Sequence, residues 1–533
     1  MAKTLGSYLI EALESQGVQH VFGIPGVHNL ELYRGLAASG IRHVAGRHEQ
    51  GLGFMADGYA RVAHRPGVCF TITGPGVSNI STAMAQAYGD SIPLLVISSE
   101  NRAAQIGTGR GFLHEMPDQL GLAARVTGSS CRVATPEELP GALSQAFVSF
   151  TSGRPRPAYI EIPRDVLGAD ASGLSPLNVA TPAARPVARP ALIVEAALRL
   201  RAAQAPLILA GGGALGASAE LRQLAQAISA PLVMTVNARG MLPPDHPLSV
   251  SMSPSLAAVR KLIAAADLVL AVGTELGPTD YDSYSVADLP QPAQLVRIDI
   301  DAAQLDRGGR PTLALHADAA SALRAILAQD LKSTNPQRGA ARAAAARTEA
   351  LAELNAPTLR QIEFLETIRS FLPNAIMVGD STQPVYAGNL GFAAATPGAW
   401  FNSATGFGTL GYALPASTGA GLAAPDRPVV CLVGDGGIQF SLGELAVPRD
   451  LDAWSAIIVW NNHGYGEIKT SMLSVGIEPE GVDVRPPDFG LLAQAYGYAH
   501  RLIDSIESLE RGLKGFAARR QVAVLEVQAE AFK

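Results

Sequence analysis

The chain has 533 residues, of which 48% are hydrophobic and 17% are charged, and its formal net charge is −6. This composition is typical of a soluble globular protein, and the length suits about three domains. The weak acidity and the lack of a long basic run argue against a nucleic-acid partner. No apolar stretch reaches the length that spans a bilayer, so no membrane segment is expected.

The three cysteines are odd in number and far apart in the sequence, and no CxxC pair suggests a zinc site. Cys69 and Cys431 lie inside apolar, strand-like runs and are expected to be buried free thiols. The N-terminus has no apolar signal-peptide core. We therefore expect a reduced, cytoplasmic protein.

The first part of the chain alternates strand and helix patterns. Apolar runs at residues 20–24, 67–72 and 93–98 predict strands, and residues 77–88 predict a helix between two of them. Such alternation is typical of a parallel sheet covered by helices. We place this first domain at residues 1–172.

A second α/β pattern follows a Pro- and Ala-rich linker at residues 176–189. Further buried strands are predicted at residues 205–210, 267–273 and 294–300, which places the second domain at residues 190–332. The Ala- and Arg-rich residues 333–355 favour a connecting helix. A third α/β domain is expected at residues 357–533, so the predicted fold class is α/β with three doubly wound parallel-sheet domains.

Two strands of the third domain end in polar motifs. The apolar run 428–433 leads into Gly434-Asp435-Gly436-Gly437, and the run 455–460 leads into Asn461-Asn462. The glycines let the backbone turn sharply, and a helix expected from about Ser441 would present amide groups that favour an anion. Asp435 and Asn462 offer hard oxygen ligands that suit Mg²⁺. The pattern therefore predicts a site for a metal and a diphosphate.

This motif pair resembles that of the thiamin diphosphate (ThDP) enzymes of the acetohydroxyacid synthase and 2-oxo acid decarboxylase group. The resemblance implies that Asp435, Asn462 and the carbonyl of Gly464 bind Mg²⁺, and that Gly436 and Gly437 contact the cofactor. The alternative is a pair of ordinary turns, since Asp-Gly is common in turns. The spacing of the two motifs, each directly after a strand, favours the cofactor site.

A second match lies near the start of the chain, where Arg47-His48-Glu49 opens a helix predicted to run to about Val62. The resemblance implies that Glu49 is catalytic and binds the aminopyrimidine ring of ThDP by a hydrogen bond. A lone Glu in the first turn of a helix is usually only a partner of the helix dipole. Its position inside RHEQGxGxMADGYAR favours the cofactor role.

The remaining cofactor contacts are implied by two further matches. In the segment 406–415, Leu410 would support the bent form of ThDP, and the carbonyl of Gly408 would accept a hydrogen bond from its amine. In the segment 378–381, Gly379 and Ser381 would lie on the diphosphate. Asp380 would repel the diphosphate unless it points away or pairs with a cation.

Substrate residues are expected in two loops. His114, at the end of the segment 106–115, falls where the synthases carry Gln and could transfer a proton, unless it is a plain surface histidine. Glu467 and Ile468 follow the second metal-site Asn, where relatives line the substrate cavity. Together with Glu115, Glu467 would form an acidic pocket that suits a cationic substrate tail.

Other enzyme classes find little support in the sequence. Residues 211–216 fit GxGxxG, but no acidic residue follows the next strand, as a dinucleotide site requires. FAD is unlikely, because Glu275 stands in a turn where FAD-binding synthases carry basic residues. The sequence contains neither GxSxG nor HExxH, which excludes an esterase-type elbow and a zincin.

A narrower resemblance lies in HEQGxGFMADGYAR, GRGFLHE, VGTELGxTDYD and NNHGYGEIK, which look similar to 5-guanidino-2-oxopentanoate (2-ketoarginine) decarboxylases. It implies ThDP- and Mg²⁺-dependent decarboxylation of a small 2-oxo acid to an aldehyde and CO₂. The alternative within the family is acetolactate synthase-like carboligation. A non-catalytic regulatory paralogue is a third reading, against which Glu49, Asp435 and Asn462 argue.

The resemblance covers essentially the whole chain and has a consequence for assembly. Glu49 lies in the first predicted domain and Asp435 in the third. In the family these two halves of the site meet across a subunit interface. We therefore expect a homodimer or homotetramer with active sites at that interface.

Overall fold

The structure is a computed structural model that describes residues 3–177, 184–281, 290–332 and 336–532. The chain forms two compact units. The first contains Met1–Ala184, Gly406–Cys431 and Gly437–Ser455, and the second contains Arg185–Thr405, Leu432–Gly436 and Ala456–Lys533. Among the described helices, none combines the length and hydropathy needed to cross a bilayer.

The first sheet has six strands in the order β2-β1-β3-β4-β6-β5, and all its pairs are parallel. Its central strands are mostly apolar and buried along their whole length, which is typical of a sheet covered on both faces. The strands are β1 His20–Gly23, β2 Arg42–Ala45, β3 Gly67–Thr71, β4 Leu94–Glu100, β5 Ser129–Arg132 and β6 Ala158–Pro163. The helices are α1 Leu5–Ser15, α2 Glu49–Ala63, α3 Pro75–Asp90, α4 Gln119–Ala124, α5 Leu139–Ser152 and α6 Arg164–Leu167.

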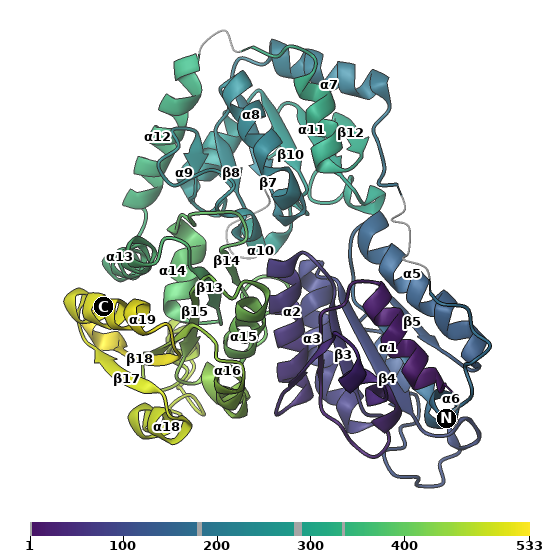
Figure 1. Ribbon diagram of the computed structural model, residues 1–533. Helices are drawn as coiled ribbons and strands as arrows, with labels where there is room; N and C mark the ends of the chain where they lie inside the picture. Colours follow the sequence, from purple (N-terminus) through teal and green to yellow (C-terminus); the bar gives the residue numbers. More distant parts are fainter. Residues whose placement is uncertain (1–2, 178–183, 282–289, 333–335, 533) are drawn as a thin grey trace. The chain divides into compact units, whose positions relative to one another are not determined.

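The second sheet has the order β12-β11-β10-β7-β8-β9 and lies between two hydrophobic cores. Helices α7, α8 and α11 build one core, and α9 and α12 build the other, as Figure 1 shows on the two sides of β7, β8 and β10. The strands are β7 Pro206–Ala210, β8 Leu232–Met234, β9 Ser249–Val250, β10 Leu268–Val272, β11 Leu295–Asp299 and β12 Leu313–His316. The helices are α7 Pro190–Ala202, α8 Ser218–Ile228, α9 Ala257–Ala264, α10 Pro278–Tyr281, α11 Ala319–Leu327 and α12 Pro336–Ala352.

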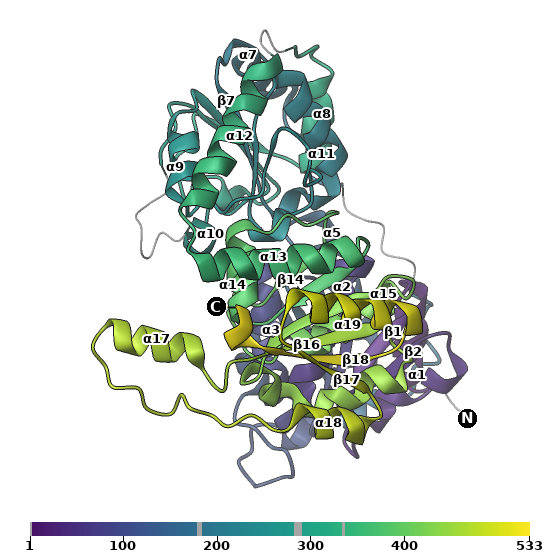
Figure 2. The same cartoon turned by 90° about the vertical axis from the view of Figure 1, so that its left-hand side faces the viewer.

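The third sheet has the order β14-β13-β15-β16-β18-β17. Its strands are β13 Ile376–Gly379, β14 Trp400–Asn402, β15 Val429–Gly434, β16 Ser455–Asn461, β17 Ala499–Ile503 and β18 Ala523–Gln528. The helices are α13 Ala356–Phe371, α14 Gln383–Gly391, α15 Ala413–Ala423, α16 Val447–Asp450, α17 Gly466–Ser474, α18 Phe489–Tyr496 and α19 Ile506–Arg519. Figure 2 shows α17 and the segment after it extending away from this sheet.

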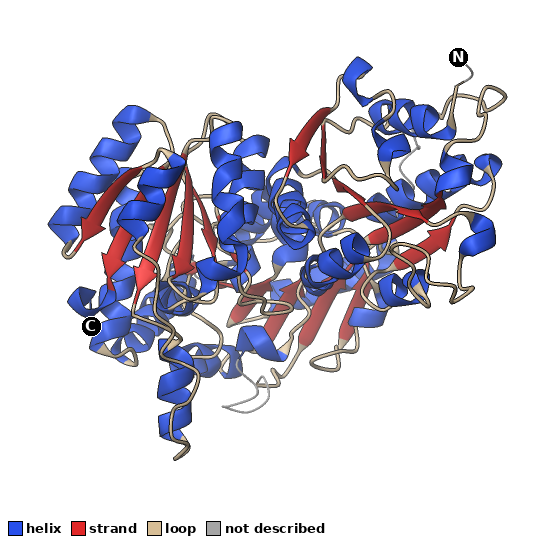
Figure 3. Ribbon diagram, turned by 90° about the horizontal axis from the view of Figure 1, so that it is seen from below, coloured by secondary structure: helices blue, strands red, loops and turns tan. Residues whose placement is uncertain are grey.

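The three parallel sheets confirm the predicted α/β fold class, and Figure 3 shows the red strands lying between blue helices. The boundaries predicted between the domains stay a prediction. The 3₁₀ element η8 spans Gly437–Ala446, and Ser441, with φ −135° and ψ 25°, is a kink that divides it into two helical pieces. A helical piece therefore begins just after Ser441, as expected, and a further helical turn from Gly437 precedes it. The glycine pair lets the chain enter a helical turn at once.

Within the first unit, α2 and α15 touch backbone to backbone. A Cβ atom on Gly58 would lie 2.0 Å from the Ala416 carbonyl oxygen, and one on Gly419 would lie 1.8 Å from that of Met55. Only glycine fits such an approach. The helix that begins with Glu49 is therefore held directly against the helix that follows Leu410.

A buried ion-pair network joins the same elements. Arg61 on α2 pairs with Asp57 at 2.7 Å and with Asp90 at 2.6 Å, and the side chain of each of the three is at most 8% exposed. The hydroxyl of Tyr412, next to α15, donates to Asp57. Burial raises the pKa of Asp57, while the Arg61 guanidinium opposes that rise.

Replacing Arg61 with Met should destabilise the protein by about 3–5 kcal/mol, because two buried carboxylates lose their cation. Urea denaturation at pH 7 measures the change. The matched control is Arg199→Met, which breaks an i,i+4 pair with Glu195 whose side chains are 28% and 44% exposed. That change should cost about 1 kcal/mol or less. Equal effects of the two substitutions would contradict the importance of the buried network.

Candidate active site

The ends of β15 and β16 bring the predicted metal-site residues together. The carboxylate of Asp435 accepts hydrogen bonds from the backbone N–H of Asn462 at 3.2 Å and of Gly464 at 2.8 Å. Asp435 is fully buried, and burial raises its pKa against the pull of these hydrogen bonds. A divalent cation beside it would favour the charged carboxylate. One carboxylate, one amide and one carbonyl within this turn suit Mg²⁺, which completes its octahedron with phosphate and water.

The turn after β13 lies in the same sheet, because β13 is the neighbour of β15. Gly379 is buried, and a Cβ atom there would lie 2.6 Å from a Val385 methyl group. Asp380 turns inward: it is fully buried, and its carboxylate accepts a hydrogen bond from Ser381 N–H at 2.8 Å. Asp380 therefore points into the protein. This orientation meets the condition, stated from the sequence, under which Asp380 would not repel a diphosphate.

Gly436 and Gly437 carry the chain from the end of β15 into η8. A Cβ atom on Gly436 would lie 2.7 Å from the ring of Tyr465, so this position has no room for a side chain. Glycines that turn directly into a helical element are a common way to hold a phosphate. The arrangement therefore fits a diphosphate next to the Asp435 turn.

Glu49 is the first residue of α2 in the first unit. Its carboxylate accepts a hydrogen bond from Asn79 Nδ2 on α3 at 2.9 Å, and its other oxygen would lie 3.6 Å from a Cβ atom on Gly76. The start of α2 is fixed by Glu444 of η8, whose carboxylate accepts the N–H groups of Arg47 and His48. Glu49 is thus a half-buried carboxylate on a rigid helix end.

His114 faces the same α3 turn and is paired with a second histidine. The rings of His114 and His28 are 5.1 Å apart and edge to face. A Cβ atom on Gly74 would lie 3.0 Å from the His114 side chain, so this histidine lies against the turn that also borders Glu49. Neither Nδ1 atom has a hydrogen-bond partner among the described residues. Burial, then Arg164 and His114, lowers the pKa of His28, which favours its neutral form.

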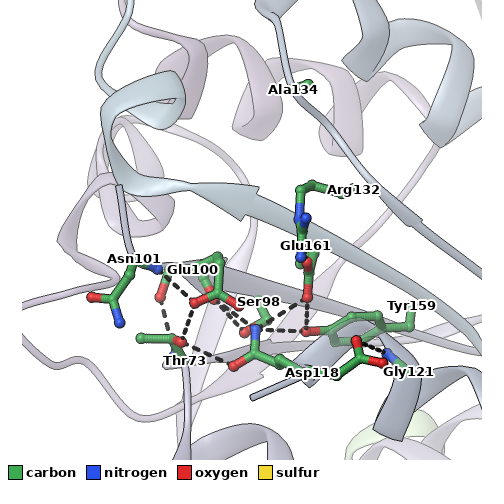
Figure 4. A network of polar contacts seen from close by, with 12 residues as sticks. Thr73, Ser98, Glu100, Asn101, Asp118, Gly121, Arg132, Ala134, Tyr159 and Glu161 are labelled. Carbon is green, nitrogen blue, oxygen red and sulfur yellow. Dashed lines mark hydrogen bonds and ion pairs between the residues drawn. The ribbon is translucent and has the colours of Figure 1, made fainter. Parts of the chain in front are cut away.

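A buried polar network anchors Thr73 and Gly74, directly before α3, and Figure 4 shows this network around Thr73, Glu100 and Tyr159. The side-chain oxygen of Gln119 accepts the Gly74 N–H at 2.7 Å and the Thr73 hydroxyl at 2.9 Å. Its nitrogen donates to Tyr159 at 2.9 Å. Thr73 also contacts Glu100, whose pKa is raised by burial. This network fixes the loop that the histidine and the glutamate share.

Gly408 and Leu410 lie at the other end of α3. The N–H of Thr409 donates to Gln86 at 3.4 Å, whereas Glu49 contacts Asn79, two helical turns earlier. Seven residues of α-helix span about 10 Å. Within one chain, Glu49 and the Gly408–Leu410 turn therefore contact different ends of α3.

The substrate-side residues occupy two exposed segments. Glu467 and Ile468 lie in the first turn of α17, and Ile468 is 55% exposed. Gln383, at the start of α14, donates from Nε2 to Glu467 at 2.7 Å. Glu115 behaves differently: its carboxylate accepts the N–H groups of Gly109, Gly111 and Phe112, so it shapes the loop that carries His114. Burial opposes its charged form, but these bonds keep the pKa of Glu115 below its ordinary value.

Three stretches of the sequence match the thiamine pyrophosphate (ThDP) enzymes. Residues 3–122 match their N-terminal TPP binding domain, residues 193–326 their central domain, and residues 380–527 their C-terminal TPP binding domain. The chain belongs to the thiamine pyrophosphate enzymes. In this ThDP enzyme, Glu49 therefore falls within the N-terminal cofactor-binding domain, and Asp435 and Asn462 fall within the C-terminal one.

Curated relatives of this ThDP enzyme are similar over nearly their full length. The probable 2-ketoarginine decarboxylase AruI of Pseudomonas aeruginosa is 46% identical over 532 residues, which covers 98% of this chain and 94% of the relative. The acetolactate synthase isozyme 1 large subunit of Escherichia coli is 33% identical, covering 87% and 82%. A probable acetolactate synthase large subunit of Methanocaldococcus jannaschii is 30% identical, covering 97% and 90%.

Four residues next to the candidate site of this ThDP enzyme were not singled out from the sequence: His28, Asn79, Gln119 and Gln383. His28 follows β1, Asn79 lies in the second turn of the helix after β3, and Gln383 opens the helix after β13, all near the edge where ligands usually bind. Their positions after predicted strands could have identified these three residues. The hydrogen bond between Gln119 and Gly74 could not be predicted in this way, because it joins a helix to a turn 45 residues earlier in the sequence.

Replacing Asp435 with Asn should weaken Mg²⁺-dependent ThDP binding by at least about 10²-fold, since losing even an outer partner of a metal ligand costs about ten- to a hundred-fold. Calorimetric titration with ThDP at fixed Mg²⁺ measures the change. The control is Asp426→Asn, at an exposed position, which should bind normally. Unchanged affinity of the Asp435 variant would exclude Asp435 as a metal ligand.

Proposed function

We propose that the protein decarboxylates a 2-oxo acid with ThDP and Mg²⁺, giving an aldehyde and CO₂, and that the substrate is 5-guanidino-2-oxopentanoate. The observation that carries this proposal is the 46% identity, over nearly the whole of both chains, to a probable 2-ketoarginine decarboxylase. The structure supports it with a coherent set of candidate residues. Each has a role that its contacts allow.

The metal and the diphosphate belong to the turns that end β13, β15 and β16. Asp435, Asn462 and the Gly464 carbonyl would supply three oxygen ligands to Mg²⁺. Gly379 and Ser381 on one side, and Gly436 and Gly437 on the other, would contact the diphosphate. FAD has no part in this proposal.

Glu49 would hydrogen-bond the aminopyrimidine ring, and Asn79 orients its carboxylate through the 2.9 Å contact. The Gly408 carbonyl would accept a hydrogen bond from the amine of that ring, and the Leu410 side chain would support the bent form of the cofactor. Gly408 has a φ of 75° and open space around it, so its backbone is accessible to a ligand.

Bound ThDP supplies an electron sink for the carbon atom that loses CO₂. The protein must then deliver one proton to that carbon, since R–CO–COO⁻ and H⁺ give R–CHO and CO₂. His114 is proposed to handle this proton. It lies against the turn that borders Glu49, and its ring contacts that of His28.

The substrate tail is assigned to Glu467 and Ile468 at the start of α17. The exposed carboxylate of Glu467 suits a guanidinium, and the Ile468 side chain suits the methylene groups between the cation and the 2-oxo acid. Glu115 is the less suitable acid, because loop N–H groups occupy its carboxylate oxygens.

The second candidate function is acetolactate synthase-like carboligation, which the similarity to acetolactate synthase large subunits favours. In that reaction a second carbonyl compound takes the place of the proton. The two functions differ in product, because decarboxylation releases an aldehyde and carboligation releases an acyloin.

Incubating the protein with ThDP, Mg²⁺ and a panel of cationic and aliphatic 2-oxo acids tests the proposal. We expect equal amounts of CO₂ and aldehyde, with the highest kcat/KM for 5-guanidino-2-oxopentanoate. Coupled assays for CO₂ and aldehyde, with chromatography for acyloins, measure the outcome. An acyloin as the main product would support the alternative, and no CO₂ from any 2-oxo acid would refute both.

We further propose that the active protein is a homodimer or a homotetramer whose sites lie between subunits. Within one chain, Glu49 and the Gly408–Leu410 turn contact α3 about 10 Å apart along its axis. Large apolar side chains around these segments are exposed in the first unit and would be covered by a second copy. They are Val27, Leu30, Leu113, Phe407 and Phe440.

Mixing two inactive variants tests the composite site. Glu49→Gln should bind ThDP but lose roughly 10²-fold or more of its turnover, and Asp435→Asn should fail to hold the cofactor. Each heterodimer would contain one intact site, so co-refolded equal mixtures should regain about a quarter of the wild-type activity. The controls are each variant refolded alone. If the mixture stays as inactive as its components, the sites are not shared between subunits.

A cytoplasmic location is also proposed. Cys69, Cys131 and Cys431 form no disulfide, and Cys69 and Cys431 are buried as the sequence predicts. Free thiols persist in a reducing compartment.

A further inference from the structure

We propose that Gln383 is a positioning residue for substrate specificity, which holds the Glu467 carboxylate so that it presents its full negative charge to the cationic tail of the substrate. This inference rests on the proposed function for the identity of the cation. It assigns a role to a residue that has no metal-binding or cofactor-binding part in the site described above.

The side chain of Gln383 is fixed at both of its polar atoms. Its Nε2 donates to Glu467 Oε1 at 2.7 Å, and its Oε1 accepts from Trp460 Nε1 at 2.8 Å. Since Trp460 Nε1 can only donate, this contact sets which end of the amide faces Glu467. Trp460 is itself immobile: it is 1% exposed, and its ring packs against Phe364 and Phe532.

The Gln383–Glu467 contact lies beside the metal-site turn. Gln383 begins α14 directly after β13, and Glu467 lies in the first turn of α17 after β16. These strands are the two neighbours of β15, which ends at Gly434, directly before Asp435. A Cβ atom on Gly466 would lie 2.7 Å from the Asn462 amide nitrogen. The contact therefore joins the loops on the two sides of the turn assigned to Mg²⁺ and diphosphate.

The charge of Glu467 is not cancelled by this arrangement. The nearest lysine in sequence, Lys469, forms its ion pair with Asp483 at 2.8 Å. Among the residues that the structure describes, Glu467 makes no ion pair, and its side chain is exposed. Burial, the largest cause, raises the pKa of Tyr386, a hydrogen bond with Ser381 lowers it, and the charges of Glu467 and Asp380 raise it further.

A neutral hydrogen-bond donor at position 383 both orients the Glu467 carboxylate and leaves its negative charge uncancelled. A lysine or arginine there would orient Glu467 but would also neutralise it. The amide of Gln383 orients the carboxylate and leaves Oε2, and a second lone pair on Oε1, for a guanidinium that binds with two parallel hydrogen bonds. Without Gln383, an exposed Glu side chain samples several rotamers and loses part of this preference.

The test compares Gln383→Met, which keeps the size but removes the donor, with Glu467→Gln and with the double variant. The substrates are 5-guanidino-2-oxopentanoate and the neutral 2-oxoheptanoate, both with the holoenzyme. Gln383→Met should raise KM for the cationic substrate about ten-fold, as expected for a hydrogen bond to a charged group, and leave kcat unchanged. KM for the neutral substrate should stay within about two-fold. Gln494→Met, at an exposed position of α18, is the matched control and should change neither constant.

The double variant separates positioning from general damage. Because Gln383 acts through Glu467, its replacement should have no further effect when Glu467 is already Gln. If Gln383→Met weakens both substrates equally, or acts equally in the Glu467→Gln background, the residue is merely structural and the proposal is overturned.

Binding of an analogue that cannot react gives an independent measure of how Gln383 affects affinity for the cationic tail. 5-Guanidinopentanoate, which lacks the 2-oxo group, should bind the holoenzyme in calorimetry and lose about ten-fold in affinity in Gln383→Met. If this dependence holds but no 2-oxo acid releases CO₂, the proposed reaction fails and the specificity role stands. If CO₂ is released without preference for the cationic acid, the reaction stands and the specificity role fails. No binding and no CO₂ release would refute both.

Discussion

The buried carboxylate of Asp435 is the constraint on which the candidate site depends. A fully buried acid at a strand end is costly unless hydrogen bonds or a cation meet it. The N–H groups of Asn462 and Gly464 supply the hydrogen bonds, and to do so the chain after β16 must curl back over the end of β15. That curl brings the backbone of Asn462 and Gly464 beside the acid. It also sets where α17 begins.

Hydrogen bonds to buried polar side chains also fix the candidate residues of the first unit. Glu49, Asn79 and His114 come from three different segments, but all meet the N-terminal end of α3. The network next to this turn centres on Gln119, which accepts the Gly74 N–H, and His114 lies against the same glycine. A polar network of this kind is rigid only while every member has a partner. The turn beside the catalytic candidates is therefore kept rigid by buried side chains, chiefly Gln119 and Thr73.

Much of this architecture could be predicted from the sequence. Continuous apolar runs identify buried parallel strands, and polar motifs directly after them identify the edge where ligands bind. That reasoning placed Asp435 and Asn462 at the ends of strands, and the helix pattern placed Glu49 at the start of a helix, where the structure has them. Local rules were weaker at the glycine pair, where a helical turn that the sequence did not predict precedes Ser441.

The contacts between distant side chains could not be predicted. Gln383 and Glu467 are 84 residues apart, and Tyr412 and Asp57 are 355 residues apart. Such pairs depend on sheet order and on the crossing of helices, neither of which follows from periodicity. The predicted role of Glu115 shows the same limit, since a carboxylate in a loop can bind a ligand or bind its own backbone. Only the structure shows that its oxygens accept loop N–H groups.

The contact between α2 and α15 also affects how natural sequence variation in this protein should be interpreted. Gly58 and Gly419 each face a carbonyl oxygen of the opposite helix with no space for a methyl group. Even alanine, the mildest substitution, would force the helices apart, and a wedge of this kind would tilt the end of α2 that begins with Glu49. Substitutions at either glycine are therefore expected to change where α2 places Glu49, although neither glycine is itself a candidate site residue. Natural variants at Gly58 and Gly419 should be weighed together with variants at the candidate residues.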